Sequence, residues 1–273
     1  MNRFGLLLVP SLLVACGGTV RDLDPDDDNR VVAKTALRAE LGGSDVDVVG
    51  VTVDPIDGKR YVFDALAGLY RLDADGAELV FRTSDLIADD AWPQSDITDV
   101  AALGGGKFAL TALNDGFLYD TNTDTFSRYF CYVPGFIEDE FAPTPIVQLT
   151  RSVTYDAQRN KLFAQPQTFQ NSADAAPEIS QVGQFDIEGG EGYGWIDLDD
   201  PAFSAGGIAI DGAGRMLLGE GDRLYRLDLE TERFDRVTDL SGHGIGAIGG
   251  LAVDGDHALV VDAETDVLYE IQL

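Results

Sequence analysis

The chain has 273 residues, with 48 acidic and 19 basic side chains and a formal net charge of -29. Hydrophobic residues make up 45% of it, which excludes wholesale disorder, and the length is ample for a well-buried core. No basic surface is available to displace phosphate counterions, so we expect no nucleic-acid partner. The two cysteines exclude a disulfide-rich scaffold and a cysteine-based zinc ribbon.

The first residues have the pattern of a secretory leader. Arg3 supplies the charge, and a mostly apolar run from Phe4 to Ala15 follows, which is too short to span a bilayer. The run ends in Leu13-Val14-Ala15-Cys16, which resembles the lipobox of bacterial lipoproteins. This resemblance implies that residues 1–15 are a signal peptide and that Cys16 is lipidated and becomes the mature N-terminus. The alternative is a conventionally cleaved secretory signal.

Residues 16–30 form the next segment, which is acidic and nearly free of apolar side chains. This composition predicts a solvated tether between the lipid at Cys16 and the folded domain. Gly17, rather than aspartate, follows the cysteine. By resemblance to Gram-negative lipoproteins, this residue implies the outer membrane, so we expect a membrane-anchored protein of the cell envelope.

Residues 31–273 repeat a short motif of apolar or β-branched residues that ends in aspartate, except in a degraded copy that begins at Asp99. Its copies are Gly50-Val51-Thr52-Val53-Asp54, Asp99-Val100-Ala101-Ala102-Leu103, Ser152-Val153-Thr154-Tyr155-Asp156, Gly207-Ile208-Ala209-Ile210-Asp211 and Gly250-Leu251-Ala252-Val253-Asp254. Two further short elements follow each copy, and a fourth follows all but the last. Turn residues bound these elements, which predicts strands, and no helical periodicity is sustained.

Units of about 40–55 residues with four strands each are typical of propeller blades. The last unit has only three strands, and residues 35–41 form a single strand near the start of the domain. We therefore predict an all-β fold: one five-bladed β-propeller of four antiparallel strands per blade, closed by this N-terminal strand completing the last blade. Six blades are the alternative, if residues 131–148 hide further strands.

The repeat resembles those of NHL-repeat, regucalcin/gluconolactonase-like (SMP-30) and strictosidine-synthase-like propellers. This resemblance implies a metal site at the central channel, where the regucalcin-like proteins use Glu, Asp and Asn side chains. The present chain offers Asp96 and Asp99 there and no asparagine. These two aspartates are the candidate metal ligands, and Ca²⁺ is the one cofactor that they suggest.

The long connections of the predicted ring emerge on one face, which we expect to carry function. They include residues 83–96, 131–148, 166–182, 199–206 and 239–249. The candidate binding residues on this face are Trp92, Phe136, Phe141, Phe169 and His243.

No catalytic constellation is specified by sequence spacing. His243 and Arg151 are the candidate catalytic side chains. Gly244-Ile245-Gly246-Ala247-Ile248-Gly249 has the spacing of a dinucleotide-binding turn, but it precedes a strand and no helix follows, so we expect no nucleotide.

Two functions fit these patterns. The first is a binding or scaffold module that presents the long-connection face to an envelope protein, a peptide or a glycan. The alternative is a metal-dependent hydrolase of the lactonase or esterase type, with its site at the mouth of the central channel. The fold serves both purposes, so the site residues decide between them. We favour the binding module, because no catalytic constellation is specified.

Overall fold

The computed structural model describes residues 30–273 except for 44, 87–96, 113–114, 132–135, 138–143, 171–176, 188–191, 199 and 201. For residues 130, 131, 136, 137, 144–148, 170, 178, 192, 193, 236 and 237 it describes the backbone alone. The signal peptide, Cys16 and the predicted tether up to residue 29 therefore lie outside the described residues.

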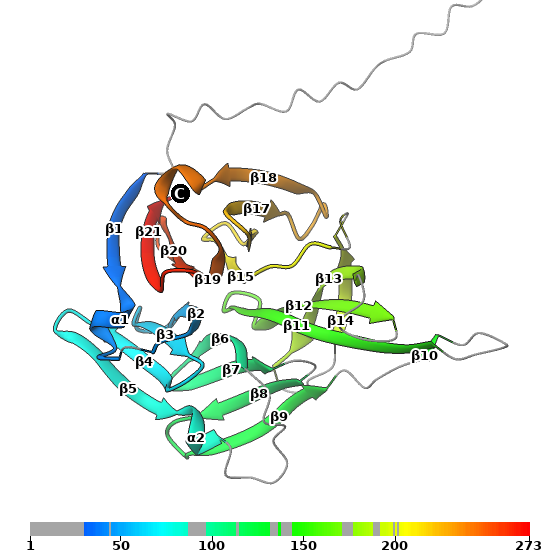
Figure 1. Cartoon of the computed structure of the whole chain (residues 1–273). Coiled ribbons are helices and arrows are strands. Elements are labelled where there is room, and N and C mark those ends of the chain that lie inside the picture. Colours follow the sequence, from blue (N-terminus) through cyan, green and yellow to red (C-terminus); the bar gives the residue numbers. More distant parts are fainter. Residues whose placement is uncertain are drawn as a thin grey trace, which may run out of the picture.

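The described chain forms five antiparallel sheets arranged around a central axis (Figure 1), which confirms the predicted five-bladed propeller. Blade one contains β2 (Val48–Val53), β3 (Arg60–Asp64), β4 (Gly68–Asp73) and β5 (Gly76–Arg82). Blade two contains β6 (Ile97–Gly104), β7 (Lys107–Ala112), β8 (Asp115–Asp120) and β9 (Thr125–Cys131). Blade three contains β10 (Phe136–Ile137), β11 (Thr144–Asp156), β12 (Lys161–Gln170), β13 (Pro177–Asp186) and β14 (Gly192–Asp197). Blade four contains β15 (Gly207–Ile210), β16 (Met216–Glu220), β17 (Arg223–Leu227) and β18 (Phe234–Asp239). Blade five contains β19 (Ile248–Asp254), β20 (His257–Asp262), β21 (Val267–Gln272) and β1 (Val31–Ala36).

The N-terminal strand closes the ring, as the sequence predicted. β1 pairs with β21 from Val31↔Ile271 to Ala36↔Val267 and so becomes the outermost strand of blade five. The predicted bounds were wrong, because the strand ends at Ala36 and Leu37–Glu40 form the helical turn α1. The turn places the Leu37 side chain, which is fully buried, between blades five and one.

Blade three departs most from the repeat. Its β11 has 13 residues and β12 and β13 have 10 each, whereas the inner strands of the other blades have 4–8. The sequence predicted a connection over residues 166–182. Pairs such as Gln167↔Ser180 and Thr168↔Ile179 instead continue the sheet through much of this segment. Residues 131–148 contain β10 and the start of β11. Both belong to the sheet of blade three, so they do not form the alternative sixth blade. This extension reaches beyond the ring on the right of Figure 1.

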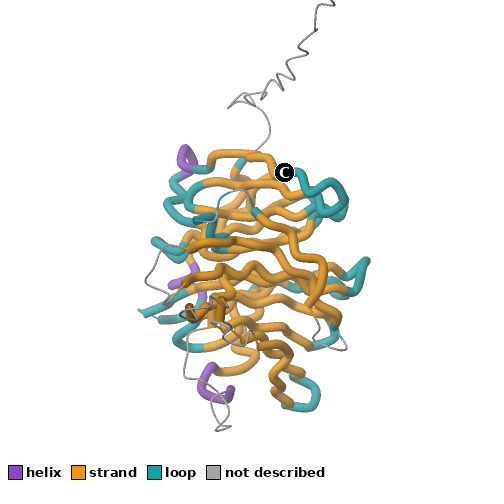
Figure 2. Tube along the Cα trace, turned by 90° about the vertical axis from the view of Figure 1, so that its right-hand side faces the viewer, coloured by secondary structure: helices purple, strands orange, loops and turns teal. Residues whose placement is uncertain are grey.

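The core consists of five apolar layers, each between two neighbouring blades. One layer packs Phe63 and Phe81 of blade one against Phe108 and Leu110 of blade two. Equivalent layers join blades two and three, three and four, four and five, and five and one. Each sheet therefore buries both of its faces, and Figure 2 shows the loops gathered at the two ends of the strands.

In blades one, three and four, the aspartate that ends the repeated motif caps the turn between the first two strands. Asp156 accepts hydrogen bonds from the backbone N–H groups of Gln158 and Arg159, at 2.9 and 3.0 Å. Asp54 and Asp211 make the same kind of contact in blades one and four. Aspartate suits this position because its short side chain bonds to backbone two residues ahead. The repeat therefore reflects turn geometry, and the face with these turns is called the short-loop face.

The described helices are single turns: α1 (Leu37–Glu40), α2 (Thr83–Leu86) and the 3-10 helix η1 (Ser241–His243). Among the described residues, no helix is long and apolar enough to cross a membrane.

The closing segment allows a direct stability test. Leu37→Ala removes a fully buried side chain beside the closing strand, so we expect the free energy of unfolding to fall by about 2–5 kcal/mol. Val32→Ala is the control, because Val32 lies in β1 but is 48% exposed, and such surface changes usually stay within about 0.5 kcal/mol. Urea unfolding measures both, and equal effects would contradict the packing of Leu37 between the first and last blades.

Candidate functional site

Each inner strand begins at the face opposite the tight turns, which we call the long-loop face, and four of the five carry a bulge there. The register shifts between Val48 and Gly50, Ile97 and Asp99, Thr150 and Ser152, and Ile248 and Gly250. The inserted residues are Val49, Thr98, Arg151 and Gly249. A bulge redirects the side chains around it and is common next to functional sites. These four residues mark the long-loop end of the central channel.

One residue further along, the inner strands approach each other so closely that glycine is required. A Cβ on Gly207 would lie 2.4 Å from the backbone nitrogen of Leu251, and one on Gly250 would lie 3.0 Å from the Cα of Gly50. Glycine permits this approach of two backbones because it has no side chain. The same level in blades two and three is occupied by Asp99 and Ser152, both buried. We call this level the waist.

The Asp99 carboxylate joins blade two to blade three at the waist. Its Oδ1 accepts the backbone N–H of Val100 at 2.8 Å, and its Oδ2 accepts that of Val153 at 3.0 Å. Asp99 is 1% exposed, and burial raises its pKa well above the usual range, while the two backbone hydrogen bonds act in the opposite direction. Among the described residues no cation pairs with it. Asp99 therefore acts in this structure as a buried acceptor for two amides.

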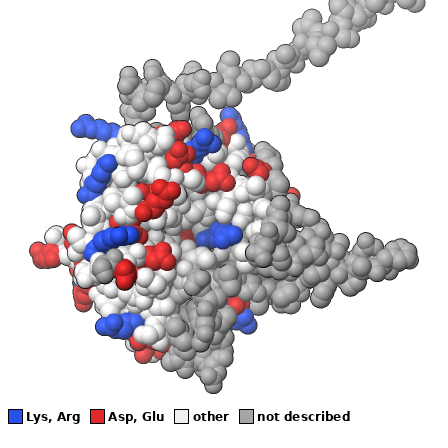
Figure 3. Space-filling view, in the orientation of Figure 1, with Lys and Arg blue, Asp and Glu red and all other residues white. Residues whose placement is uncertain are grey.

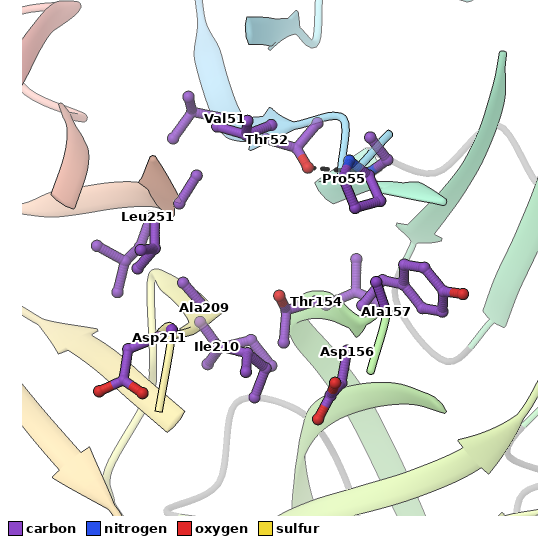
Figure 4. A pocket seen from close by; sticks show the side chains of 18 of the residues that line it. Val51, Thr52, Pro55, Thr154, Asp156, Ala157, Ala209, Ile210, Asp211 and Leu251 are labelled. Atoms are coloured by element: carbon purple, nitrogen blue, oxygen red, sulfur yellow. Dashed lines mark hydrogen bonds between the residues drawn. The ribbon is translucent and has the colours of Figure 1, made fainter. Parts of the chain in front are cut away.

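A cavity of about 270 Å³ occupies the channel on the short-loop side of the waist. Most of its lining residues have apolar side chains and come from the inner strands, and Thr52, Thr154 and Tyr155 are the hydroxyl-bearing residues among them. The carboxylates of Asp156 and Asp211 turn away from the middle of the cavity (Figure 4), because they cap turns and pair with Arg159 and Arg215. The Thr52 hydroxyl accepts the backbone N–H of Ala102 at 2.9 Å. The cavity offers shape and apolar surface and no free charged side chain.

On the long-loop side, a polar layer separates blades three and four. Gln165 Nε2 donates to the Ser180 hydroxyl at 2.6 Å, and Ser180 donates to the Phe203 carbonyl at 2.7 Å. Gln167 Nε2 donates to the same carbonyl at 2.9 Å, and its Oε1 accepts the Arg151 Nε at 3.2 Å. Arg151 is half-buried, and burial lowers its pKa. This layer contains buried side chains that can bind a polar ligand.

Several residues predicted for the site lie outside the part of the chain that the structure describes. They are Trp92, Asp96 and Phe141, and for Phe136 only the backbone in β10 is described. Phe169 is 4% exposed, so its ring is packed inside the blade-three extension and does not form part of an open surface. No group of three or more metal-binding side chains occurs among the described residues. The predicted pair of Asp96 and Asp99 stays a prediction, with Asp99 committed to backbone amides.

The two candidate catalytic residues are not brought together. Arg151 lies in the innermost strand of blade three. The segment of η1 that contains His243 lies beside the outer strands of blade five, because Lys34 of β1 donates to the His243 carbonyl at 3.1 Å and Tyr269 donates to that of Gly244 at 3.2 Å. A joint catalytic role for the two side chains therefore has no geometric basis.

The polar side chains of Gln165, Gln167 and Ser180 were not predicted as site residues from the sequence. They are fully or almost fully buried, with exposed fractions of 0%, 2% and 0%. Gln165 pairs with Ser152 at the waist level, where the equivalent residues of other blades are Phe63, Thr111, Gly219 and Val261. The available signal was the two glutamines that flank Pro166. Buried amides are normally hydrogen-bonded, so glutamines in a buried strand would have indicated a polar network.

Charged side chains are mixed on the described part of the face that Figure 3 shows, and acidic and basic groups lie close together there. At the opposite, short-loop ends of the strands, Arg60 pairs with Asp254 and Glu270, and Arg71 pairs with Asp73 and Glu78. The net charge is therefore distributed, and no single-sign patch marks a site on the described part of the face that Figure 3 shows.

The fold and the channel define a five-bladed β-propeller, and comparisons with solved structures agree with a β-propeller fold. No protein-family model matches the chain, and no curated protein matches its sequence. Among solved structures, a Bacteroides thetaiotaomicron protein of unknown function is similar, with a TM-score of 0.53 and 12% identity over 81% of this chain. This chain spans 58% of that protein's length. A luciferin-regenerating enzyme has a TM-score of 0.50 and 10% identity, with 88% of this chain and 80% of the other covered. At these identities the similarity shows the fold alone.

The raised pKa of Asp99 predicts a pH-dependent contribution to stability. The folded chain holds the Asp99 proton more tightly than the unfolded chain, so this contribution is full below the ordinary aspartate pKa of about 3.9 and is lost as the pH rises through the folded pKa. Asp99→Ala leaves the Val153 N–H without this acceptor, and we expect it to cost about 1–3 kcal/mol at low pH and less at high pH.

Urea unfolding of the wild type and the variant between pH 4 and pH 8 measures the difference. Asp57→Ala is the control, because the hydrogen bond from Lys59 lowers the pKa of the exposed Asp57 and gives the opposite pH trend. If the loss of unfolding free energy caused by Asp99→Ala grew with pH, the raised pKa of the buried Asp99 would be contradicted.

Proposed function

We propose that this protein is a lipid-anchored propeller of the bacterial cell envelope that binds a partner through its long-loop face. The anchor is the lipidated Cys16, residues 17–30 are the tether, and the outer membrane is the location that the sequence favours. The partner class is an envelope protein, a peptide or a glycan. The repeat and its turn-capping aspartates support placing the chain in the broad group of NHL-repeat and regucalcin-like propellers.

The observation that carries the binding role is the length of blade three. The other blades build the ring with inner strands of 4–8 residues, so the additional residues of β11, β12 and β13 are not needed to close it. The extension presents Ile179, which is 42% exposed, and the outer strand of the same blade presents Trp195, which is 40% exposed. Ile179 and Trp195 are large apolar side chains of blade three that a partner could contact.

The described residues favour the binding module over the metal-dependent hydrolase. Asp99 is committed to two amides, Arg151 and His243 lie on different blades, and the channel cavity has a mainly apolar lining. A rigid ring with a projecting sheet extension suits recognition, since a preformed surface loses little conformational entropy on binding.

The anchor is tested by labelling cells with a palmitate analogue. We expect the wild-type chain to incorporate the label and to sediment with the envelope, whereas Cys16→Ser should abolish both. Cys131→Ser is the matched control, because Cys131 ends β9 and should leave the labelling unchanged. Envelope association of Cys16→Ser without label would contradict lipid anchoring.

The binding face is tested by photo-crosslinking in intact envelopes. A photoreactive residue at position 179, in the blade-three extension, should give a discrete adduct with a partner. The control is position 56, an isoleucine that is 76% exposed in a turn of the short-loop face. An adduct from position 56 alone, or the same adducts from both positions, would show that the long-loop face is not the binding face.

A further inference from the structure

Arg151 is a half-buried cation without a carboxylate partner. Most described arginines of this acidic chain are ion-paired, as Arg128 is with Asp115 and Arg215 is with Asp211. Arg151 instead donates its Nε to the neutral amide oxygen of Gln167, and no carboxylate of the described residues forms an ion pair with it. A guanidinium keeps its charge even when burial lowers its pKa. Arg151 is therefore a partly desolvated positive charge that no carboxylate of the described part of the chain neutralises.

The ring does not require a charge at this position. Val49, Thr98 and Gly249 occupy the same bulge in blades one, two and five. An apolar side chain, a hydroxyl and a glycine therefore all allow the bulge to form. Since a desolvated arginine costs free energy, its presence in blade three calls for a reason outside the fold.

The neighbouring amides hold the guanidinium in one orientation. Gln167 must present its oxygen to Arg151, because its nitrogen already donates to the Phe203 carbonyl at 2.9 Å. With Nε bound to that oxygen, the two terminal nitrogens of Arg151 have no partner among the described residues. The terminal nitrogens of a guanidinium form a planar pair of donors that matches the two oxygens of a carboxylate.

A second observation lies next to the arginine. The Ser152 hydroxyl is fully buried and has no hydrogen-bond partner among the described residues. The same holds for the side-chain oxygen of Gln165, directly opposite on β12. Directly opposite residues share a face of the sheet, here the face on which Gln165 contacts the Phe203 carbonyl of the segment before β15. A buried hydroxyl without an acceptor is costly. An incoming oxygen acceptor would satisfy it together with the guanidinium.

We propose that Arg151 is the receptor for a carboxylate group of a ligand, bound at the long-loop end of the central channel between blades three and four. Arg151 binds the two oxygens of the carboxylate, and Ser152 provides a further hydroxyl donor. This assignment rests on the proposed function, since it names the charge of the group that the long-loop face takes. A carboxylate fits better than a phosphate, because a single arginine in a chain of net charge -29 balances one negative charge and not two.

The test is a calorimetric titration of the full chain with acetate, succinate and a short glutamate peptide, at constant ionic strength set with chloride. We expect saturable binding that Arg151→Gln weakens by about tenfold or more, since hydrogen bonds to charged groups contribute about 1.5–3 kcal/mol. Arg151→Lys keeps the charge without the planar pair of donors and should weaken binding by less. Ser152→Ala should weaken it by about fivefold.

Arg226→Gln is the matched control. Arg226 is also half-buried. Burial and the nearby Arg215 lower its pKa, but, unlike Arg151, it has two carboxylates close by, Asp211 and Asp235, which act in the opposite direction. This variant should bind like the wild type. Binding of acetate or succinate would identify a small carboxylate ligand, and binding of the peptide alone would identify an acidic side chain of a partner. Either result supports the site if Arg151→Gln weakens binding by about tenfold or more while the variant remains folded.

Three results would overturn the proposal: no binding of any carboxylate, binding that is insensitive to Arg151→Gln, or tighter binding of sulfate or phosphate than of the carboxylates. The crosslinking experiment at position 179 is independent of this pocket. Adducts at position 179 without carboxylate binding would support the binding face and contradict the carboxylate site. Carboxylate binding without adducts would support the carboxylate site and contradict the binding face.

Discussion

Every sheet of this protein has two apolar faces, and each face must be covered by another sheet. A linear stack would leave its two terminal faces exposed to water, whereas a ring leaves none. The five inter-blade layers of the core are the result, with Leu37 and Val261 in the layer that joins the last blade to the first. β1 is essential to this arrangement, because it covers the outer edge of blade five and joins the two ends of the chain.

Ring closure with five blades brings the inner strands close together at the axis. Gly50, Gly207 and Gly250 allow this contact at the waist, where blades two and three place Asp99 and Ser152 instead. The channel therefore has two different ends. The short-loop end is a mainly apolar cavity, and the long-loop end is polar where the extended blade three meets blade four. The proposed binding role and the carboxylate site both belong to the second end, because the strands of blade three depart from the repeat there.

The sequence predicted most of the scaffold. The motif from Gly50 to Asp54 and its four copies identified the inner strands. The short element predicted to follow each copy is the second strand of its blade, such as Arg60–Asp64, Lys107–Ala112 and His257–Asp262. Such strands are readable because alternating apolar residues and turn aspartates act over a few residues. Blade three was misjudged, because its extension contains glutamine, proline and serine, which resemble a loop in composition. Their pairing with β11 depends on residues distant in sequence.

The sequence by itself determined the repeat and the need for an N-terminal strand to complete the last blade, and it favoured five blades over six. These follow from local patterns and from counting strands. The structure decided against a sixth blade by placing β10 and the start of β11 in blade three. Only the tertiary structure decided which polar residues face each other. Asp99 became a buried acceptor for Val153, 54 positions away, and Gln167 came to orient Arg151 from 16 positions away. The register of the strands and the approach of blades at the axis bring these groups together, and neither is encoded in the spacing of neighbouring residues.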